Sequence, residues 1–340
     1  MRLLSALFAI ACAAVALATP LASNTTLTGR NVQAIPPPNC FPAIGFRMPS
    51  SVPSSLSNWW CDYSTEYAFV GISYEITQCQ PVDRLRREFS DLRTRWNSRY
   101  VRLYGFCDEP GYYDKVIDAA WSAGVGVHAL IWFGWDGGTQ WKGRRDSLFN
   151  TLQSNQRAKF VTRVVQFGSE PLYDWAIHSQ DLAREVWDAK AKLANLQIPV
   201  TVSEMAYGYQ VREGDGSINV LNAVDFVDAH MLPYFSHQAS TAWNAWPIVM
   251  GDLSWFLNNS GGKKIYLSQP NSPNAVANVQ NEQYQDYYDL LDSHCVDFKN
   301  MKGGGVGWFA HIYSDYQEPG YGIYKSDGTL KIRFNPRTSC

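Results

Sequence analysis

A single glutamate at the end of a predicted strand is the strongest candidate for catalytic chemistry in this sequence. Glu170 follows the apolar run Thr162–Phe167 and is separated from it only by Gly168 and Ser169. A carboxyl group at such a strand end can donate a proton to a leaving-group oxygen and later recover it, which is general acid/base catalysis. The same residue type can instead cap the helix that follows, which would be a structural role. The surroundings of Glu170 therefore decide between the two.

Aromatic side chains at other predicted strand ends could supply a binding surface near this acid. The chain has 13 Trp and 19 Tyr among its 340 residues, more than a core requires. Sugars present apolar C–H faces that stack on aromatic rings, so the surplus indicates a carbohydrate ligand, although core packing is the ordinary role of such rings. The candidates for a stacking surface are Tyr74, Tyr104, Trp132, Trp135 and Trp308.

The elements that must position these residues alternate regularly. Short β-rich runs are followed by segments in which apolar residues recur at three- and four-residue steps, as in βα units with a parallel sheet. The predicted strands are Ala68–Tyr74, Tyr100–Tyr104, Val125–Trp132, Thr162–Phe167, Val200–Ser203, Phe226–His230, Lys264–Ser268 and Gly305–His311. The predicted helices include Val82–Trp96, Tyr112–Ala123, Gln180–Asn195 and Glu282–Phe298. This alternation predicts an α/β fold of the (β/α)8 TIM-barrel type, in which chemistry lies at the carboxyl ends of the strands.

The remaining regions predict a secreted protein with one folded domain. Residues 1–18 have the charged start, apolar core and small-residue end of a signal peptide, and the apolar run is too short to span a membrane. Residues 19–66 form an aperiodic N-terminal extension, and residues 67–340 form the barrel domain. A net charge of −2 gives no electrostatic case for nucleic acid or an anionic membrane. We expect a monomer without cofactor or metal.

Six cysteines remain after removal of the signal peptide, which suggests disulfide bonds in a secreted chain. Cys79 follows the first predicted strand and Cys107 follows the second, so both lie on adjacent loops at the same end of the barrel and can pair. A Cys40–Cys61 disulfide would then cross-link the N-terminal extension, and a Cys295–Cys340 disulfide would fix the C-terminus. Sequence alone permits other pairings. N-glycosylation sequons begin at Asn24 and Asn258.

Several short motifs lie at the predicted strand ends: Val101–Tyr104, Gly168–Tyr173, Asp228–Phe235, Trp308–His311, and Gly322–Tyr324 with Asp327–Gly328. With these motifs, from about Tyr67 to the C-terminus, the chain resembles the fungal branch of family 17 glycoside hydrolases, the β-1,3-glucanases and cell-wall glucanosyltransferases. The resemblance implies that Glu170 is the general acid/base of a retaining reaction on β-1,3-glucan in the cell wall. It also implies that His230 and Tyr234 orient the second catalytic group or bind sugar.

The seventh predicted strand departs from the family pattern. Retaining glycosidases need a second carboxylate about 5–5.5 Å from the acid as nucleophile. The family supplies it from a Glu-Thr-Gly-Trp-Pro motif, whereas here Gln269 holds the glutamate position and Pro270 follows without a Gly-Trp-Pro turn. An amide is a far poorer nucleophile than a carboxylate and cannot stabilise an oxocarbenium ion by charge.

Three explanations of this departure stay open. The protein has lost catalysis, another carboxylate substitutes, or a segment after Gln269 is missing from the chain. Glu204, after the fifth strand, is the substitute nearest to a strand terminus, and the others are Asp136, Asp315 and Glu318. An inverting mechanism, with carboxyl groups about 6.5–9.5 Å apart, is also open.

The sequence therefore supports two functions of different class. The first is a glycoside hydrolase or transglycosylase acting on β-1,3-glucan, with Glu170 as the acid. The second is a catalytically inactive protein that binds wall glucan through an aromatic groove. A third hypothesis is that the residues of the groove have changed so far that the protein binds no glucan.

Overall fold

The computed structural model describes residues 39–134, 137–233, 241–270 and 280–340. The predicted signal peptide and most of the predicted N-terminal extension lie outside these ranges. No helix within them is long and apolar enough to cross a membrane.

Eight parallel strands form a closed barrel in chain order, β1 to β8, and each strand pairs with the next. They are β1 (Ala68–Glu75), β2 (Tyr100–Tyr104), β3 (Gly126–Ile131), β4 (Thr162–Ser169), β5 (Val200–Glu204), β6 (Val227–Met231), β7 (Ile265–Pro270) and β8 (Val306–Ala310). Pairing of β1 with β8 closes the barrel. The predicted (β/α)8 barrel is therefore confirmed.

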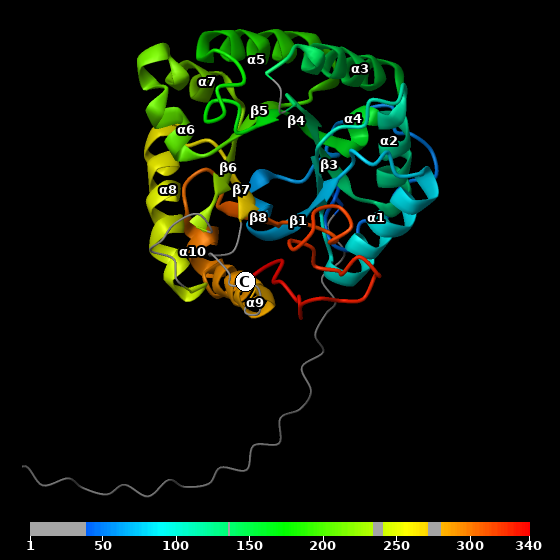
Figure 1. Cartoon of the computed structure of the whole chain (residues 1–340). Helices are drawn as coiled ribbons and strands as arrows, with labels where there is room; N and C mark the ends of the chain where they lie inside the picture. Colours follow the sequence, from blue (N-terminus) through cyan, green and yellow to red (C-terminus); the bar gives the residue numbers. More distant parts are fainter. Residues whose placement is uncertain (1–38, 135–136, 234–240, 271–279) are drawn as a thin grey trace, which may run out of the picture. The chain divides into compact units, whose positions relative to one another are not determined.

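Helices surround the barrel on the outside, as Figure 1 shows in a view along its axis. They are α1 (Val82–Trp96), α2 (Tyr112–Ala123), α3 (Gln140–Ser154), α4 (Ala158–Val161), α5 (Ser179–Leu193), α6 (Ala206–Val211), α7 (Ser217–Ala223), α8 (Trp246–Asn259), α9 (Gln280–Ser293) and α10 (Cys295–Asn300). In α1 the buried residues Leu85, Phe89, Leu92 and Trp96 recur at helical spacing and form one apolar stripe. The helix predicted over 282–298 is wrong in one respect, because the chain breaks at His294 and forms two helices.

The alternation of side chains along each strand decides which residues reach the barrel interior. Ser73, Arg102 and Ser203 point inward, where the Arg102 guanidinium approaches both serine hydroxyl groups. Tyr74 and Glu204 directly follow two of these residues and therefore point outward, toward the helices.

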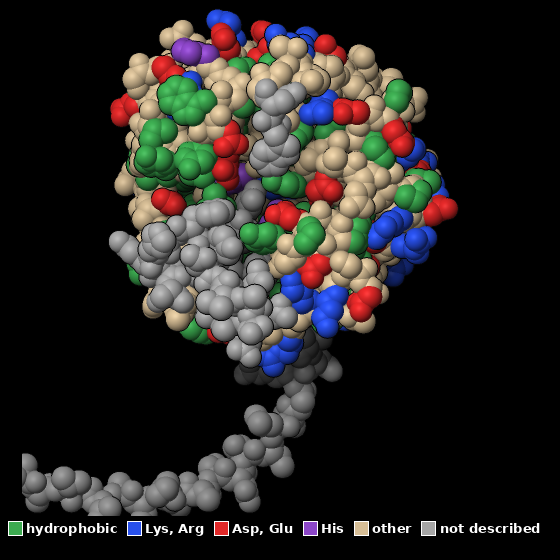
Figure 2. Space-filling view, in the orientation of Figure 1, with side chains coloured by type: hydrophobic (Ala, Val, Ile, Leu, Met, Phe, Trp, Pro, Cys, Tyr) green, Lys and Arg blue, Asp and Glu red, His purple; other side chains and the backbone are tan. Residues whose placement is uncertain are grey.

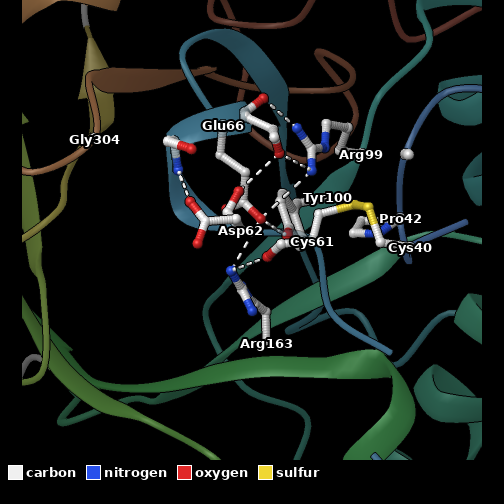
Figure 3. Close-up of polar contacts among 12 residues, drawn as sticks. Cys40, Pro42, Cys61, Asp62, Glu66, Arg99, Tyr100, Arg163 and Gly304 are labelled. Atoms are coloured by element: carbon white, nitrogen blue, oxygen red, sulfur yellow. Dashed lines mark hydrogen bonds and ion pairs between the residues drawn. A yellow bond between two sulfur atoms is a disulfide. The ribbon is translucent and has the colours of Figure 1, made fainter. Parts of the chain in front are cut away.

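The segment before β1 closes the end of the barrel opposite the strand carboxyl ends. Figure 3 shows Glu66 there between Arg99 and Arg163, with the Cys40–Cys61 disulfide nearby. Arg163 Nη2 donates to Glu66 Oε1 at 3.0 Å, and the Tyr100 hydroxyl donates to the same oxygen at 2.6 Å. Burial alone would raise the pKa of Glu66, but the charges of Arg163 and Arg99 lower it. This buried, charge-compensated cluster ties the segment before β1 to the starts of β2 and β4.

All three predicted disulfides are confirmed. The pairs are Cys40–Cys61, Cys79–Cys107 and Cys295–Cys340. The second pair joins the loops after β1 and β2, and the third fixes the C-terminus to the start of α10. The loops after β1 and β2 are thus cross-linked at the carboxyl end of the barrel.

Candidate active site

An irregularity in β4 sets the position of Glu170. The pairing of β4 with β5 shifts register between Phe167 and Ser169, so Gly168 bulges from the ladder. Gly168 has φ +66°, and a Cβ there would lie only 2.7 Å from the Phe133 ring, so glycine is required for both reasons. Glu170 follows with φ +58° and donates its backbone N–H to the Ser203 carbonyl at 2.8 Å. The bulge directs the Glu170 side chain into the mouth of the barrel.

A chain of hydrogen bonds holds the Glu170 carboxyl from the barrel interior. Glu170 Oε1 lies 2.7 Å from His230 Nδ1, and His230 Nε2 lies 3.1 Å from Arg102 Nη2. A guanidinium can only donate, so His230 Nε2 must accept. The proton of the imidazole is therefore on Nδ1, which donates to Glu170. Ser203 Oγ lies within 3.0 Å of His230 Nε2 and completes the support.

His230 is buried while the Glu170 side chain is 17% exposed, so only the carboxyl group reaches the open end. Burial lowers the pKa of His230, although the hydrogen bond and charge of Glu170 act in the opposite direction. The adjacent Arg102 charge also favours the neutral imidazole. His230 is therefore a neutral donor that orients Glu170.

The carboxyl end of β7 lies beside His230. The pairing of β6 with β7 shifts register after Ala229, and His230 then pairs with Gln269. The backbone of Gln269 consequently stands next to the residue that holds Glu170, which is where the family resemblance implies the second catalytic group. Its side chain lies outside the described part of the site.

A cavity of about 840 Å³ opens at the same end of the barrel, on the side of β1, β2, β3 and β8. Tyr104 and Trp132 line it with rings whose centroids are 5.2 Å apart. Burial and the charge of Glu318 raise the pKa of Tyr104, and the charge of Glu170 acts in the same direction. Figure 2 shows acidic and histidine side chains in the hollow at the centre of this face. Tyr104 thus lies within electrostatic range of carboxyl groups from two sides of the mouth.

Glu318 and Glu75 are carboxyl groups in this cavity. His311, at the end of β8, places Nε2 2.8 Å from Glu318 Oε2. Burial opposes ionisation of Glu318, but the hydrogen bond and charge of His311 lower its pKa. Glu75 ends β1 and accepts the Thr77 N–H at 2.6 Å; burial raises its pKa despite that hydrogen bond, and the charge of Glu318 adds to the rise. The pKa of Glu318 is therefore lowered while that of Glu75, in the same cavity, is raised.

Glu204 is fully buried and points away from the mouth. Its Oε2 accepts the backbone N–H groups of Leu172 at 2.7 Å and Tyr173 at 3.2 Å, and its Oε1 accepts that of Met205 at 2.9 Å. Burial raises the pKa of Glu204 well above its ordinary value, and the charge of Glu170 adds to this. Both oxygens are occupied in holding the turn after Glu170 and the start of α6.

Two of the predicted stacking residues do not reach the cavity. Tyr74 is fully buried, contacts Phe89 of α1 and has its hydroxyl 3.0 Å from that of Tyr316. Trp308 is fully buried and stacks on Tyr288 of α9 with 5.7 Å between ring centroids. Strand alternation turns both rings toward the helices, so neither is available to a sugar. Trp135 and Tyr234 lie outside the described residues.

The structure also places the remaining carboxylates that the sequence suggested. Asp315 Oδ1 accepts the N–H groups of Gly320 and Gly322 and pairs with Lys331 at 3.0 Å, so it stabilises the C-terminal loop. Asp136 lies outside the described residues. Arg102, Ser203, Glu75 and His311 were missed as site residues. The period of two along the strands could have found Arg102 and Ser203, and the strand-end rule could have found Glu75.

No protein-family model matches the chain, and no curated protein matches its sequence. Its fold does match solved structures. A family 17 β-1,3-glucanosyltransferase from Rhizomucor miehei gives a TM-score of 0.63 at 22% identity, covering 81% of this chain and 99% of that chain. An active-site mutant of the β-1,3-glucanosyltransferase from Rhizomucor miehei, in complex with laminaritriose, gives the same TM-score and coverage at 20% identity. The exo-β-1,4-mannosidase Op5Man5 from Opitutaceae bacterium strain TAV5 gives 0.57 at 11% identity, covering 79% of this chain and 59% of that one.

The likeness to these solved structures establishes the fold. This chain is a (β/α)8 barrel similar to that of a family 17 glycoside hydrolase, as the sequence motifs predicted. Activity depends on the residues that face the mouth, because one fold supports many functions.

Proposed function

We propose that this chain is a secreted glycoside-hydrolase-like protein that acts on β-1,3-glucan of the cell wall, with Glu170 as the general acid. The observation that carries the proposal is the hydrogen bond from His230, which fixes a partly exposed carboxyl group at the mouth of the barrel. The adjoining cavity, lined by Tyr104 and Trp132, supports a carbohydrate ligand. Three disulfides and the exposed sequon residue Asn258 support the secretory route.

In this mechanism Glu170 protonates the glycosidic oxygen while the bond to the anomeric carbon breaks. The N–H of His230 occupies Oε1, which leaves Oε2 to carry the transferred proton toward the leaving group. His230 is neutral, and its single N–H group is engaged in the hydrogen bond to Glu170. We therefore assign His230 a positioning role. The resemblance supports a retaining reaction, which needs a second carboxylate.

We propose Glu318 as the second carboxylate because of the chemistry of its surroundings, and the retaining mechanism then requires its carboxyl group to come within about 5–5.5 Å of that of Glu170. Glu318 lines the cavity, and the hydrogen bond from His311 favours its ionised form, as a nucleophile requires. Glu204 is a structural residue in this proposal, because backbone N–H groups occupy both of its oxygens inside the helix layer.

A specific observation favours a second candidate function, glucan binding without cleavage. Gln269 pairs with His230 in the barrel, so an amide stands at the position that the family resemblance gives to the nucleophile. A groove with one acid and no nucleophile would still bind sugar through its rings.

Release of reducing sugar from laminarin, together with electrophoresis in laminarin-containing gels, separates these functions. The wild type should release sugar, and Glu170→Gln and Glu318→Gln should each lower the rate by about 100-fold or more. Glu185→Gln is the matched control and should leave the rate unchanged, because Glu185 lies in the helix layer, where it pairs α5 with Arg145 of α3.

Other results of the two laminarin assays lead to different conclusions about function. Retarded migration without sugar release in the wild type would favour glucan binding, and a gain of release in Gln269→Glu would then identify Gln269 as the lost nucleophile position. An unretarded wild type that releases no sugar would overturn both functions.

A further inference from the structure

Large aromatic side chains are exposed beside Glu170, on the side of the mouth away from the cavity. Tyr173 and Trp175 follow Glu170 on the loop after β4, and Tyr207 lies on α6 after β5. The ring centroids of Tyr173 and Tyr207 are 6.2 Å apart. Figure 2 shows hydrophobic side chains gathered on this face over α6 and α7. We refer to Tyr173, Trp175 and Tyr207 as the aromatic platform.

Trp175 is held in its exposed position from beneath. The Arg212 guanidinium lies 3.6 Å from the centroid of the Trp175 ring, while Arg212 is itself 2% exposed. Asp215 fixes that guanidinium through Nε at 2.7 Å and Nη2 at 2.5 Å. One face of the indole is thus covered by a fixed cation, and Trp175 still leaves 67% of its surface open to solvent.

The backbone of Trp175 is also in an unfavourable conformation. Its φ is +55°, in the left-handed region that residues with a bulky side chain rarely adopt. Such outliers persist where surrounding contacts enforce them, and they concentrate at functional sites. Here backbone hydrogen bonds close the turn, from the Trp175 N–H to the Leu172 carbonyl at 3.3 Å and from the Ala176 N–H to the Pro171 carbonyl at 3.0 Å, and the Arg212 stack holds the indole.

Polar groups stand next to the indole. A cavity of about 500 Å³ is lined by Trp175, Val211 and Arg212 together with His178 and Asp215. A flat apolar ring beside hydroxyl-binding polar groups is the combination that sugar recognition requires. The platform also begins on the loop that carries Glu170, so a chain of sugars leaving the acid on the β4 and β5 side would run onto it.

We propose that the aromatic platform binds a segment of a β-1,3-glucan polymer outside the reaction centre. This inference rests on the proposed substrate class. Short oligosaccharides would occupy the 840 Å³ cavity alone, whereas a long chain would also stack on Trp175. The platform thereby selects polymer over short fragments.

The test compares the affinities of Trp variants for laminarin and for laminaritriose by titration calorimetry, and every protein, the wild-type reference included, carries Glu170→Gln so that the sugars are not cleaved. Trp175→Ala should weaken laminarin binding about fivefold to tenfold, the loss expected from one stacked ring, and leave laminaritriose binding unchanged. Trp175→Phe should retain most of the affinity. Trp187→Ala is the matched control, because Trp187 is 54% exposed with Lys190 4.6 Å from its ring but lies on α5 in the helix layer.

The outcomes separate this inference from the proposed function. If the wild type binds laminarin and Trp175→Ala binds it equally well, Trp175 only covers Arg212 and the platform is overturned, while the proposed function stands. If the wild type binds neither sugar, the proposed function fails and the platform with it. Should Trp175→Ala misfold, Tyr207→Ala replaces it, with a thermal melt to confirm folding and the same selective loss expected.

Discussion

His230 Nδ1 lies 2.7 Å from Glu170 Oε1, although the two residues are 60 positions apart in the chain. The contact joins the ends of β4 and β6 across β5 and continues through His230 Nε2 to the buried Arg102. The direction of the Glu170 carboxyl is therefore set from inside the barrel rather than by the loop that carries it.

The protonation state of His230 is the first prediction. At pH 6.5, where an unperturbed imidazole is half protonated, His230 should be mostly neutral with its proton on Nδ1, because burial lowers its pKa and Arg102 donates to Nε2. Nitrogen-15 chemical shifts of the imidazole report both properties directly. The His230→Gln spectrum assigns the signal, and an imidazolium or an Nε2–H tautomer at that pH would contradict the hydrogen-bond chain.

The second prediction concerns Glu204. Glu204→Gln should lower the free energy of unfolding by about 1–3 kcal/mol, because an amide cannot accept from all three backbone N–H groups and one buried donor loses its partner. Laminarin affinity and turnover of the folded variant should remain within about twofold of the wild type, since the side chain does not reach the mouth. Urea denaturation measures the first quantity. If Glu204→Gln were as stable as the wild type but its turnover were lower by orders of magnitude, Glu204 would instead be the nucleophile.

Much of this fold could be predicted because its signals are local. The buried strands are short apolar runs, and the stripe Leu85, Phe89, Leu92 and Trp96 repeats at helical spacing, so α1 was predicted with the bounds that the structure shows. The Cys79–Cys107 pair followed from barrel geometry alone, because loops after adjacent strands lie side by side. Period and topology determine these features without knowledge of side-chain detail.

The site was less predictable because it depends on side-chain direction at strand ends. Glu204, Tyr74 and Trp308 all lie at or near the carboxyl ends of strands, yet strand alternation turns each of them into the helix layer. The bulge at Gly168 shifts this alternation in β4 just before Glu170. A one-residue irregularity of this kind reverses which side chains face the mouth, and its signal in the sequence is only a glycine.

The last prediction is a dependence of stability on pH caused by Asp292, near the end of α9. Burial raises its pKa from 3.8 to about 7, although its Oδ2 accepts the Arg337 N–H at 2.9 Å. The folded state therefore holds the proton more tightly, so the stabilisation is complete below pH 3.8 and is lost as pH rises to about 7. Asp292→Asn should remove this dependence and be more stable than the wild type at pH 8, by about 1–2 kcal/mol after allowance for the partial exposure of the group. Urea midpoints at pH 4 and pH 8 measure the effect. Asp188→Asn, on the exposed side of α5, is the control. Parallel pH curves for Asp292→Asn and the wild type would contradict the prediction.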